Sequence, residues 1–371
     1  MKKIFFSFVA LAAIAACTKS EVAYEAPAEI GFVAVANNIT KAPVSGTTYP
    51  TDLNLYVNAF TSDWGDAEAE NTPNYFTNIE FTHRDNGKWG GVQPQYWPNE
   101  TALHFSGYSK SGNIGAETGA ATASYNPNTD KLTITGYNPG TENNDLMWFP
   151  KTQSYTKETG AAGVTAYMYH TCSWITFIVQ GDATTGSSTS TYKITSLTMN
   201  GLDLTANVVC AGNTSLEQNT VPTYVVWSEN TDQEETYAVT VATDGVSLTS
   251  TYVAENNTTP KNIETGAIDD DATTNINEAT TGGNIVVIPQ KPGTIDLAWS
   301  YKSNTNNDIN DTATGLSLSL GKETIDGAEV EKSWKPGKHY VYTITVTANE
   351  ILIAPTPVDW VNDVNHGVTV E

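Results

Sequence analysis

The chain has 371 residues, of which 16% are charged, and its formal net charge is −23. This length is enough for two domains of ordinary size. The 18 basic residues do not cluster, which argues against a nucleic-acid-binding protein, and the acidity gives no help in binding anionic lipid or polysaccharide.

The first residues predict an export signal. Lys2 and Lys3 precede an apolar run over 4–16, which is shorter than the roughly 20 residues that a membrane-spanning helix needs. The run ends in the order Ile, Ala, Ala, Cys17, which has the form of a bacterial lipobox. We therefore expect a signal peptide over 1–16 and a thioether-linked diacylglycerol on Cys17. The alternative is an ordinary signal peptide with a chance cysteine.

Lipidation at Cys17 would anchor the mature chain to a membrane. Each buried methylene contributes about 0.8 kcal/mol, so several acyl chains, palmitate among them, would hold the N-terminus firmly. Thr18 and Lys19 follow the cysteine. Because no aspartate stands directly after Cys17, the sequence favours the outer membrane or the cell surface over retention at the inner membrane.

A tether and a short strand are predicted next, within a segment 17–41 that ends in a protease-accessible link. Apolar residues occupy both faces of the strand, which is typical of full burial. Lys41 and Ala42 then stand in a small, polar, proline-containing stretch. Lys41 is a candidate cut site for a trypsin-like protease, and the alternative is a solvated turn residue. One face of the strand carries Ile30, Phe32, Ala34 and Ala36, and the other carries Val33 and Val35.

The rest of the sequence predicts an all-β fold. Long helical periodicity is absent, and the 18 tyrosines and 9 tryptophans suit strands. The pair Asn86 and Gly87 gives a hairpin turn signal. A long strand is expected over 167–179. Shorter alternating strands are expected over 52–60, 103–108, 131–135, 192–204, 206–210, 224–227, 237–241, 246–252, 284–289, 295–301, 316–320 and 340–346.

The segment 181–191 is the expected link between two domains. It consists almost entirely of Gly, Ser and Thr and has little to bury. Alternating strands split by turn residues on both sides of it indicate β-sandwiches. The predicted domains are an N-terminal sandwich over 42–183 and a C-terminal sandwich over 184–371.

The sequence carries little that indicates chemistry. Its five histidines are scattered, and it lacks the G-x-S-x-G, phosphate-loop and H-E-x-x-H patterns. We therefore expect neither an enzyme nor a metal or cofactor site. In an exported protein Cys172 and Cys210 can form a disulfide, or they can remain two buried thiols. Trp64 and Trp89 lie in loop-like contexts and are candidates for a sugar-stacking platform.

Taken in order along the chain, these blocks resemble the fimbrillin (Mfa-like) family, the subunits of type V pili. Each matching piece is short, and their shared order and spacing carry the resemblance. The pieces are the lipobox ending at Cys17, Ile30-Gly31-Phe32 with Thr40-Lys41-Ala42, Tyr96-Trp97-Pro98 with 103–108, Asp145-Leu146-Met147, Tyr169-His170-Thr171, Val287-Ile288-Pro289-Gln290 and 334–342.

The resemblance implies a structural protein of the cell-surface fimbrium that serves adhesion or colonisation. It implies two tandem transthyretin-like β-sandwich domains, export as a lipoprotein, cleavage behind the first strand and polymerisation with other pilin subunits by strand exchange. The cut site matches Lys41. The family more often has arginine there, but lysine keeps the positive charge that a trypsin-like pocket needs. The implied donor strand is the C-terminal segment 351–371, with Ile351, Leu352, Ile353, Val368 and Val370 as its apolar residues.

Loss of the first strand would leave a costly vacancy. Ile30, Phe32, Val33 and Val35 would each leave a site worth about 1.5–3 kcal/mol when filled. Their sum, on the order of 6–12 kcal/mol, is comparable to the net stability of a domain. An extended segment of another subunit would fill such a groove. The alternative function is a surface lipoprotein that does not polymerise and binds glycans through exposed aromatic residues.

Overall fold

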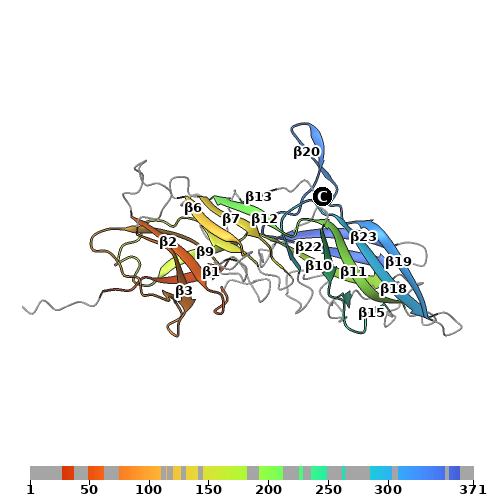
Figure 1. Cartoon of the computed structure of the whole chain (residues 1–371), viewed down its shortest axis with the longest axis horizontal. Helices are drawn as coiled ribbons and strands as arrows, with labels where there is room; N and C mark the ends of the chain where they lie inside the picture. Colours follow the sequence, from red (N-terminus) through yellow and green to blue (C-terminus); the bar gives the residue numbers. More distant parts are fainter. Residues whose placement is uncertain are drawn as a thin grey trace, which may run out of the picture.

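The computed structural model describes residues 27–36, 49–61, 75–109, 114, 120–126, 131–140, 145–181, 192–211, 225–228, 235–248, 261–263, 285–302, 308–346 and 351–359. Every regular element in these ranges is a β-strand, which confirms the all-β class. The molecule is elongated, with β1, β2 and β3 at one end and β18, β19 and β23 at the other (Figure 1).

Seven strands near the N-terminus form a closed barrel in the order β1-β4-β3-β2-β5-β8-β9. Their core contains the expected apolar alternation, for example Leu103 and Phe105, both fully buried. The turn predicted at Asn86 and Gly87 joins β3 to β4, and Gly87 has a positive φ of 77°. The strands are β1 (Gly31–Ala36), β2 (Leu55–Thr61), β3 (Phe76–His83), β4 (Trp89–Gly91), β5 (Leu103–Ser109), β8 (Met147–Phe149) and β9 (Val164–His170).

A four-stranded sheet lies beside the barrel in the order β13-β12-β7-β6. It combines β6 (Thr122–Asn126) and β7 (Lys131–Tyr137) with β12 (Ala206–Ala211) and β13 (Val225–Trp227), which follow the expected link in sequence. Its buried residues share one apolar cluster with side chains of the barrel such as Trp148.

Two five-stranded sheets form the other end of the molecule. Phe177 and Ile344 from one sheet and Leu197 and Leu297 from the other belong to a single buried core, as in a β-sandwich. The first sheet contains β10 (Ser173–Gly181), β16 (Lys261–Asn262), β17 (Ile285–Val287), β22 (Lys338–Val346) and β23 (Ile351–Asp359). The second contains β11 (Tyr192–Leu202), β14 (Glu235–Val239), β15 (Val246–Ser247), β18 (Thr294–Lys302) and β19 (Asp308–Ser317).

A separate hairpin of β20 (Lys322–Ile325) and β21 (Ala328–Glu331) projects from this end of the molecule (Figure 1).

The single long strand expected over 167–179 is wrong. The chain forms β9 up to His170 and begins β10 at Ser173, and the two strands belong to different sheets. Alternation of apolar residues continues across both strands, so the sequence pattern does not mark the break.

Strand pairs and a shared core connect residues on both sides of the expected division at 183 and 184. The strands before and after that point, β10 and β11, face one another across the same core. The β12–β13 pair then returns to β7. Short apolar strands predict which residues are buried, but not which sheet each strand joins, because pairing depends on distant parts of the chain. The tandem transthyretin-like arrangement remains a prediction.

Candidate functional site

The candidate site is the place that β1 occupies between β4 and β9, which we name the β1 slot. Ile30 and Phe32 are fully buried there, and Ala34 is 6% exposed. The Phe32 ring meets Phe81 edge-on at a centroid distance of 4.9 Å and Phe105 at 5.1 Å. Such edge-to-face pairs add to the stabilisation from buried area. The predicted first strand is therefore part of the barrel core.

The outward face of β1 is less buried than the sequence predicts. Val33 and Val35 are partly exposed, whereas Ile30, Phe32 and Ala34 point into the core. The expectation of equal burial on both faces is wrong because the barrel encloses only one face of each of its strands. Most of the apolar burial of the strand therefore comes from Ile30 and Phe32.

The pairing of β1 uses strands from two distant parts of the chain. It runs antiparallel to β4, with Phe32 opposite Trp89, and parallel to β9 from Phe32 opposite Val164 to Ala36 opposite Met168. A parallel neighbour cannot be joined through a tight hairpin. Within the described residues, therefore, packing and ladder hydrogen bonds hold β1 in its slot, without a hairpin to either neighbour.

Further contacts hold the beginning of β1. The Ile30 N–H donates to the Gln95 carbonyl oxygen (2.7 Å), and the Trp97 N–H donates to the Ala28 carbonyl oxygen (3.0 Å). Glu29 forms an ion pair of 2.8 Å with Arg84, and the two side chains are 34% and 37% exposed. These contacts hold the residues that precede β1, which begins at Gly31.

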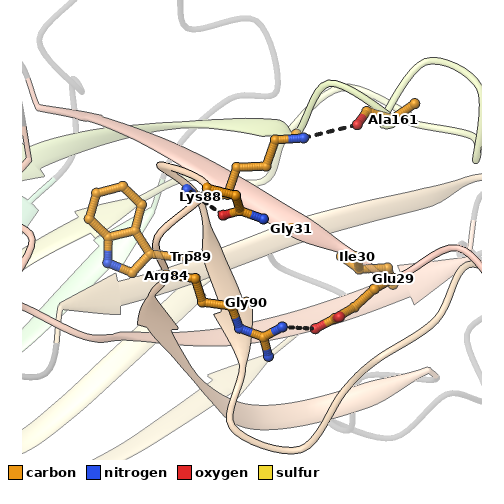
Figure 2. A pocket seen from close by; sticks show the side chains of 11 residues that line it. Glu29, Ile30, Gly31, Arg84, Lys88, Trp89, Gly90 and Ala161 are labelled. Atoms are coloured by element: carbon orange, nitrogen blue, oxygen red, sulfur yellow. Dashed lines mark hydrogen bonds and ion pairs between the residues drawn. The ribbon is translucent and has the colours of Figure 1, made fainter.

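A pocket of about 100 Å³ lies at this end of the slot (Figure 2). Arg84 and Lys88 enter it from the turn between β3 and β4. Arg84 donates from Nη2 to the Gly91 carbonyl oxygen at 2.6 Å, and Lys88 donates from Nζ to the Ala161 carbonyl oxygen at 3.0 Å. The pocket therefore brings two cations over the start of β1, and sequence reasoning missed both.

The predicted donor segment begins as β23. This strand pairs with β22 from Val346 opposite Ile351 to Lys338 opposite Asp359, and it lies at the edge of its sheet. Ile351 and Ile353 pack partly buried against the core, whereas Leu352 is 49% exposed. The other predicted site residues lie outside the described residues: Cys17, Lys41, Ala42, Val368 and Val370.

The structure contains Cys172 and Cys210 as free, buried thiols rather than as a disulfide. Both belong to the apolar cluster that joins the barrel to the four-stranded sheet. Burial raises the pKa of the Cys172 thiol, and the carboxylate of Asp145 raises it further. Burial also raises the pKa of the Cys210 thiol, with a smaller contribution from Cys172.

A buried pair of hydrogen-bonded side chains, Asp145 and His170, lies where β9 ends and β10 begins. His170 Nδ1 lies 2.6 Å from Asp145 Oδ2, and both side chains are almost completely buried. The two residues after His170 accept hydrogen bonds from other parts of the chain. Trp227 Nε1 donates to the Thr171 carbonyl oxygen (2.6 Å), and the Gly337 N–H donates to the Cys172 carbonyl oxygen (2.8 Å). The pair was not predicted, since its members are far apart in sequence.

The structure does not support the proposed sugar platform at Trp89. That indole is 3% exposed and donates to the Leu53 carbonyl oxygen at 2.9 Å. The expectation of an exposed ring is wrong because the strand that follows the turn already begins at Trp89. Trp64 lies outside the described residues.

Over the ranges that the structure describes, no group of three His, Cys, Asp or Glu side chains is placed to hold a metal. No helix long and apolar enough to cross a membrane occurs among them.

The fold is similar to known crystal structures. A fimbrial protein from Bacteroides vulgatus is 14% identical, with a TM-score of 0.53 over 89% of this chain and 99% of that one. Proposed cell adhesion proteins from Bacteroides uniformis and Bacteroides ovatus are 10% and 13% identical, each with a TM-score of 0.45. The first covers 90% of this chain and 99% of its own, and the second 91% and 100%.

Comparison of sequences identifies the family. No curated protein sequence matches this chain. The sequence profile described as Fimbrillin-like matches residues 40–360, which is most of the chain. The chain therefore belongs to the fimbrillin-like family.

Proposed function

We propose that this protein is a subunit of a surface fimbrium that serves adhesion. It is exported as a lipoprotein through Cys17, anchored to the outer membrane, cut after Lys41 by a trypsin-like protease, and polymerised when a strand of another subunit replaces β1. Family membership supports the fimbrial role. The burial of β1 in the barrel supports the polymerisation step.

The observation that carries the proposal is that β1 fills part of the barrel core and, within the described residues, forms no hairpin with either neighbour. A cut after Lys41 separates β1 from every strand that pairs with it, since β4 and β9 both follow in sequence. The cut breaks no described hydrogen bond, so β1 would stay in place until another strand competes for the slot.

The energy of burial explains why the empty slot would be filled. Ile30 and Phe32 are fully buried, and burial of each such side chain contributes about 1.5–3 kcal/mol. The two together account for about 3–6 kcal/mol, a large part of the 5–15 kcal/mol net stability of a typical domain. Val33 and Val35 add less because they are partly exposed.

The C-terminal strand has the properties of a donor. It is an edge strand with one neighbour in the sheet order, and its apolar residues alternate in burial from Ile351 to Ile353. Main-chain hydrogen bonds would hold it in the slot of another copy, and the alternate side chains would fill the inward sites.

Limited trypsin treatment of the purified chain tests this function. We expect a fragment that begins at Ala42, identified by N-terminal sequencing, and oligomers that form after the cut, followed by light scattering. The Lys41→Gln variant should abolish both. Lys322→Gln is the matched control, because Lys322 is 56% exposed in β20 and lies at the other end of the molecule. A cut protein that loses β1 and stays monomeric would contradict the proposal.

A further inference from the structure

Arg84 is held in place by the barrel strand beside β1, independently of β1 itself. It is the only arginine in the sequence. Its guanidinium lies across Gly90, where an added Cβ would collide with it, and it donates to the Gly91 carbonyl oxygen. Both contacts belong to β4. If β1 left, the guanidinium would keep this position and lose Glu29 as its partner.

Lys88 adds a second cation over the same part of the strand. Its side chain passes over Gly31, at whose position an added Cβ would lie 3.6 Å from Lys88 Cδ. Its Nζ then reaches the Ala161 carbonyl oxygen on the far side of β1. Figure 2 shows both cations beside Glu29 and Gly31. The open end of an empty slot would therefore favour a strand that brings a carboxylate.

The sequence at β23 repeats the pattern of β1 with this carboxylate included. In β1 the acid Glu29 is followed by inward residues one, three and five positions later, which are Ile30, Phe32 and Ala34. Read in the same direction, Glu350 is followed at the same spacing by Ile351, Ile353 and Pro355.

Transfer to the slot would bury the isoleucines of this segment more deeply. Ile351 and Ile353 are partly buried in their own sheet, whereas Ile30 and Phe32 in the slot are fully buried. The gain in burial favours the slot over the edge position.

We propose that Arg84 sets the register of whichever strand fills the β1 slot. It pairs with Glu29 of the resident strand and, after cleavage, with Glu350 of a second copy of this chain. A slip of one residue would turn the apolar side chains of the incoming strand outward, so one charge pair at the end of the slot selects the productive alignment. This inference rests on the proposed strand replacement.

Binding of a peptide tests the pairing. The peptide spans 349–359, is blocked at both ends so that its termini carry no charge, and has a fluorescent label. We expect it to bind trypsin-cleaved protein and not uncut protein. Because the Glu29–Arg84 pair is about one-third exposed, Glu350→Gln should weaken binding about two- to fivefold. The matched control is Asp359→Asn, which neutralises a carboxylate at the other end of the peptide and should not weaken binding.

Variants of Arg84 show whether Arg84 and Glu350 form a direct ion pair or whether the charge of Glu350 acts on binding in a general way. In Arg84→Gln protein, the unchanged and Glu350→Gln peptides should bind equally. In Arg84→Glu protein, the Glu350→Lys peptide should bind better than the unchanged one. Rescue by exchange of the two charges is not expected if Arg84 only supports the fold.

A disulfide cross-link between the peptide and β9 tests the register of the peptide in the slot directly. In the proposed alignment Ala354 takes the place of Val33, which lies opposite Thr165 of β9. An Ala354→Cys peptide should therefore form a disulfide with Thr165→Cys protein. Peptides carrying Ile353→Cys or Pro355→Cys should not form this disulfide, since their thiol lies one residue away from the position opposite residue 165.

The outcomes separate this inference from the proposed function. If cleaved protein binds neither this peptide nor one spanning 360–371, strand replacement fails and the register role fails with it. If the 349–359 peptide binds but Glu350→Gln changes nothing, strand replacement stands and the register role of Arg84 is overturned. Tighter binding of the 360–371 peptide in the slot would also overturn the pairing with Glu350.

Discussion

The indole of Trp174 and the imidazole of His339 lie stacked, with ring centroids 3.7 Å apart and planes that differ by 8°. They belong to the parallel neighbours β10 and β22, and Thr176 Oγ1 lies 2.9 Å from His339 Nε2. Burial lowers the pKa of His339 from 6.5 to about 3. The neutral imidazole is therefore the form that fits this site.

This depressed pKa predicts a loss of stability in mild acid. The unfolded chain binds a proton at His339 between pH 6.5 and about 3, whereas the folded chain does not. The contribution is thus fully present above pH 6.5 and declines as the pH falls below it, by about 1.4 kcal/mol per pH unit. We expect the His339 contribution at pH 5 to be about 2 kcal/mol lower than at pH 7.5.

Denaturant unfolding at the two pH values measures this contribution. His339→Gln should remove about 2 kcal/mol of the pH dependence that the unchanged protein shows. His83→Gln is the control for the loss of a histidine, because His83 is a partly buried histidine on β3 in the other half of the molecule. An equal pH dependence in the His339 variant and the unchanged protein would argue against a neutral buried imidazole.

Two substitutions in β1 should differ strongly in cost. Phe32→Ala removes a fully buried ring that packs against Phe81 and Phe105, which should destabilise the uncut protein by about 3–5 kcal/mol. Val33→Ala, one residue away and partly exposed, should cost less than about 1.5 kcal/mol. Thermal unfolding of both variants measures the difference, and similar losses would show that β1 is not an ordered core strand.

The Asp145–His170 pair should be costly to break from one side. Both side chains are almost fully buried, and His170 Nδ1 lies 2.6 Å from Asp145 Oδ2. Removal of one partner therefore leaves a buried polar group of the other without its hydrogen bond. His170→Leu is expected to cost about 3–5 kcal/mol. The double variant Asp145→Leu/His170→Leu removes both polar groups and should lose less stability than the single one. Chemical unfolding of the single and double variants measures these losses in the free energy of unfolding. A loss in the double variant equal to the sum of the losses in the two single variants would contradict the coupling.

The two thiols should be unreactive in the folded protein. Cys172 and Cys210 are buried, and burial raises the pKa of both, so the reactive thiolate is scarce. Iodoacetamide at pH 8 should label both only after the protein is unfolded. Fast labelling of the native protein, or a mass two hydrogens lower in exported protein, would contradict the free-thiol state.

Much of the barrel core could be predicted from the sequence, because apolar alternation reports burial directly. Ile30 and Phe32 follow this rule and are fully buried. The partial exposure of Val33 and Val35 could not be predicted, since it depends on which face the barrel encloses. The division of 167–179 into β9 and β10 depends in the same way on partners more than a hundred residues away, such as β22.

The polar part of the site was harder to predict. A turn signal at Asn86 and Gly87 placed the hairpin correctly, but it does not show that the turn reaches across β1. Arg84 and Lys88 act on Glu29 and Ala161 through tertiary contacts. The rarity of arginine in the chain is a sequence signal that could have indicated Arg84.

N-terminal analysis of the subunit in assembled filaments tests the central claim most directly, namely that a strand of another subunit replaces β1 during assembly. Filaments sheared from cells that export this chain are dissociated, and the first residues of the subunit are determined. We predict a sequence that begins at Ala42, without the lipid and without β1. A filament subunit that still begins at acylated Cys17 and retains Ile30 and Phe32 would contradict the account.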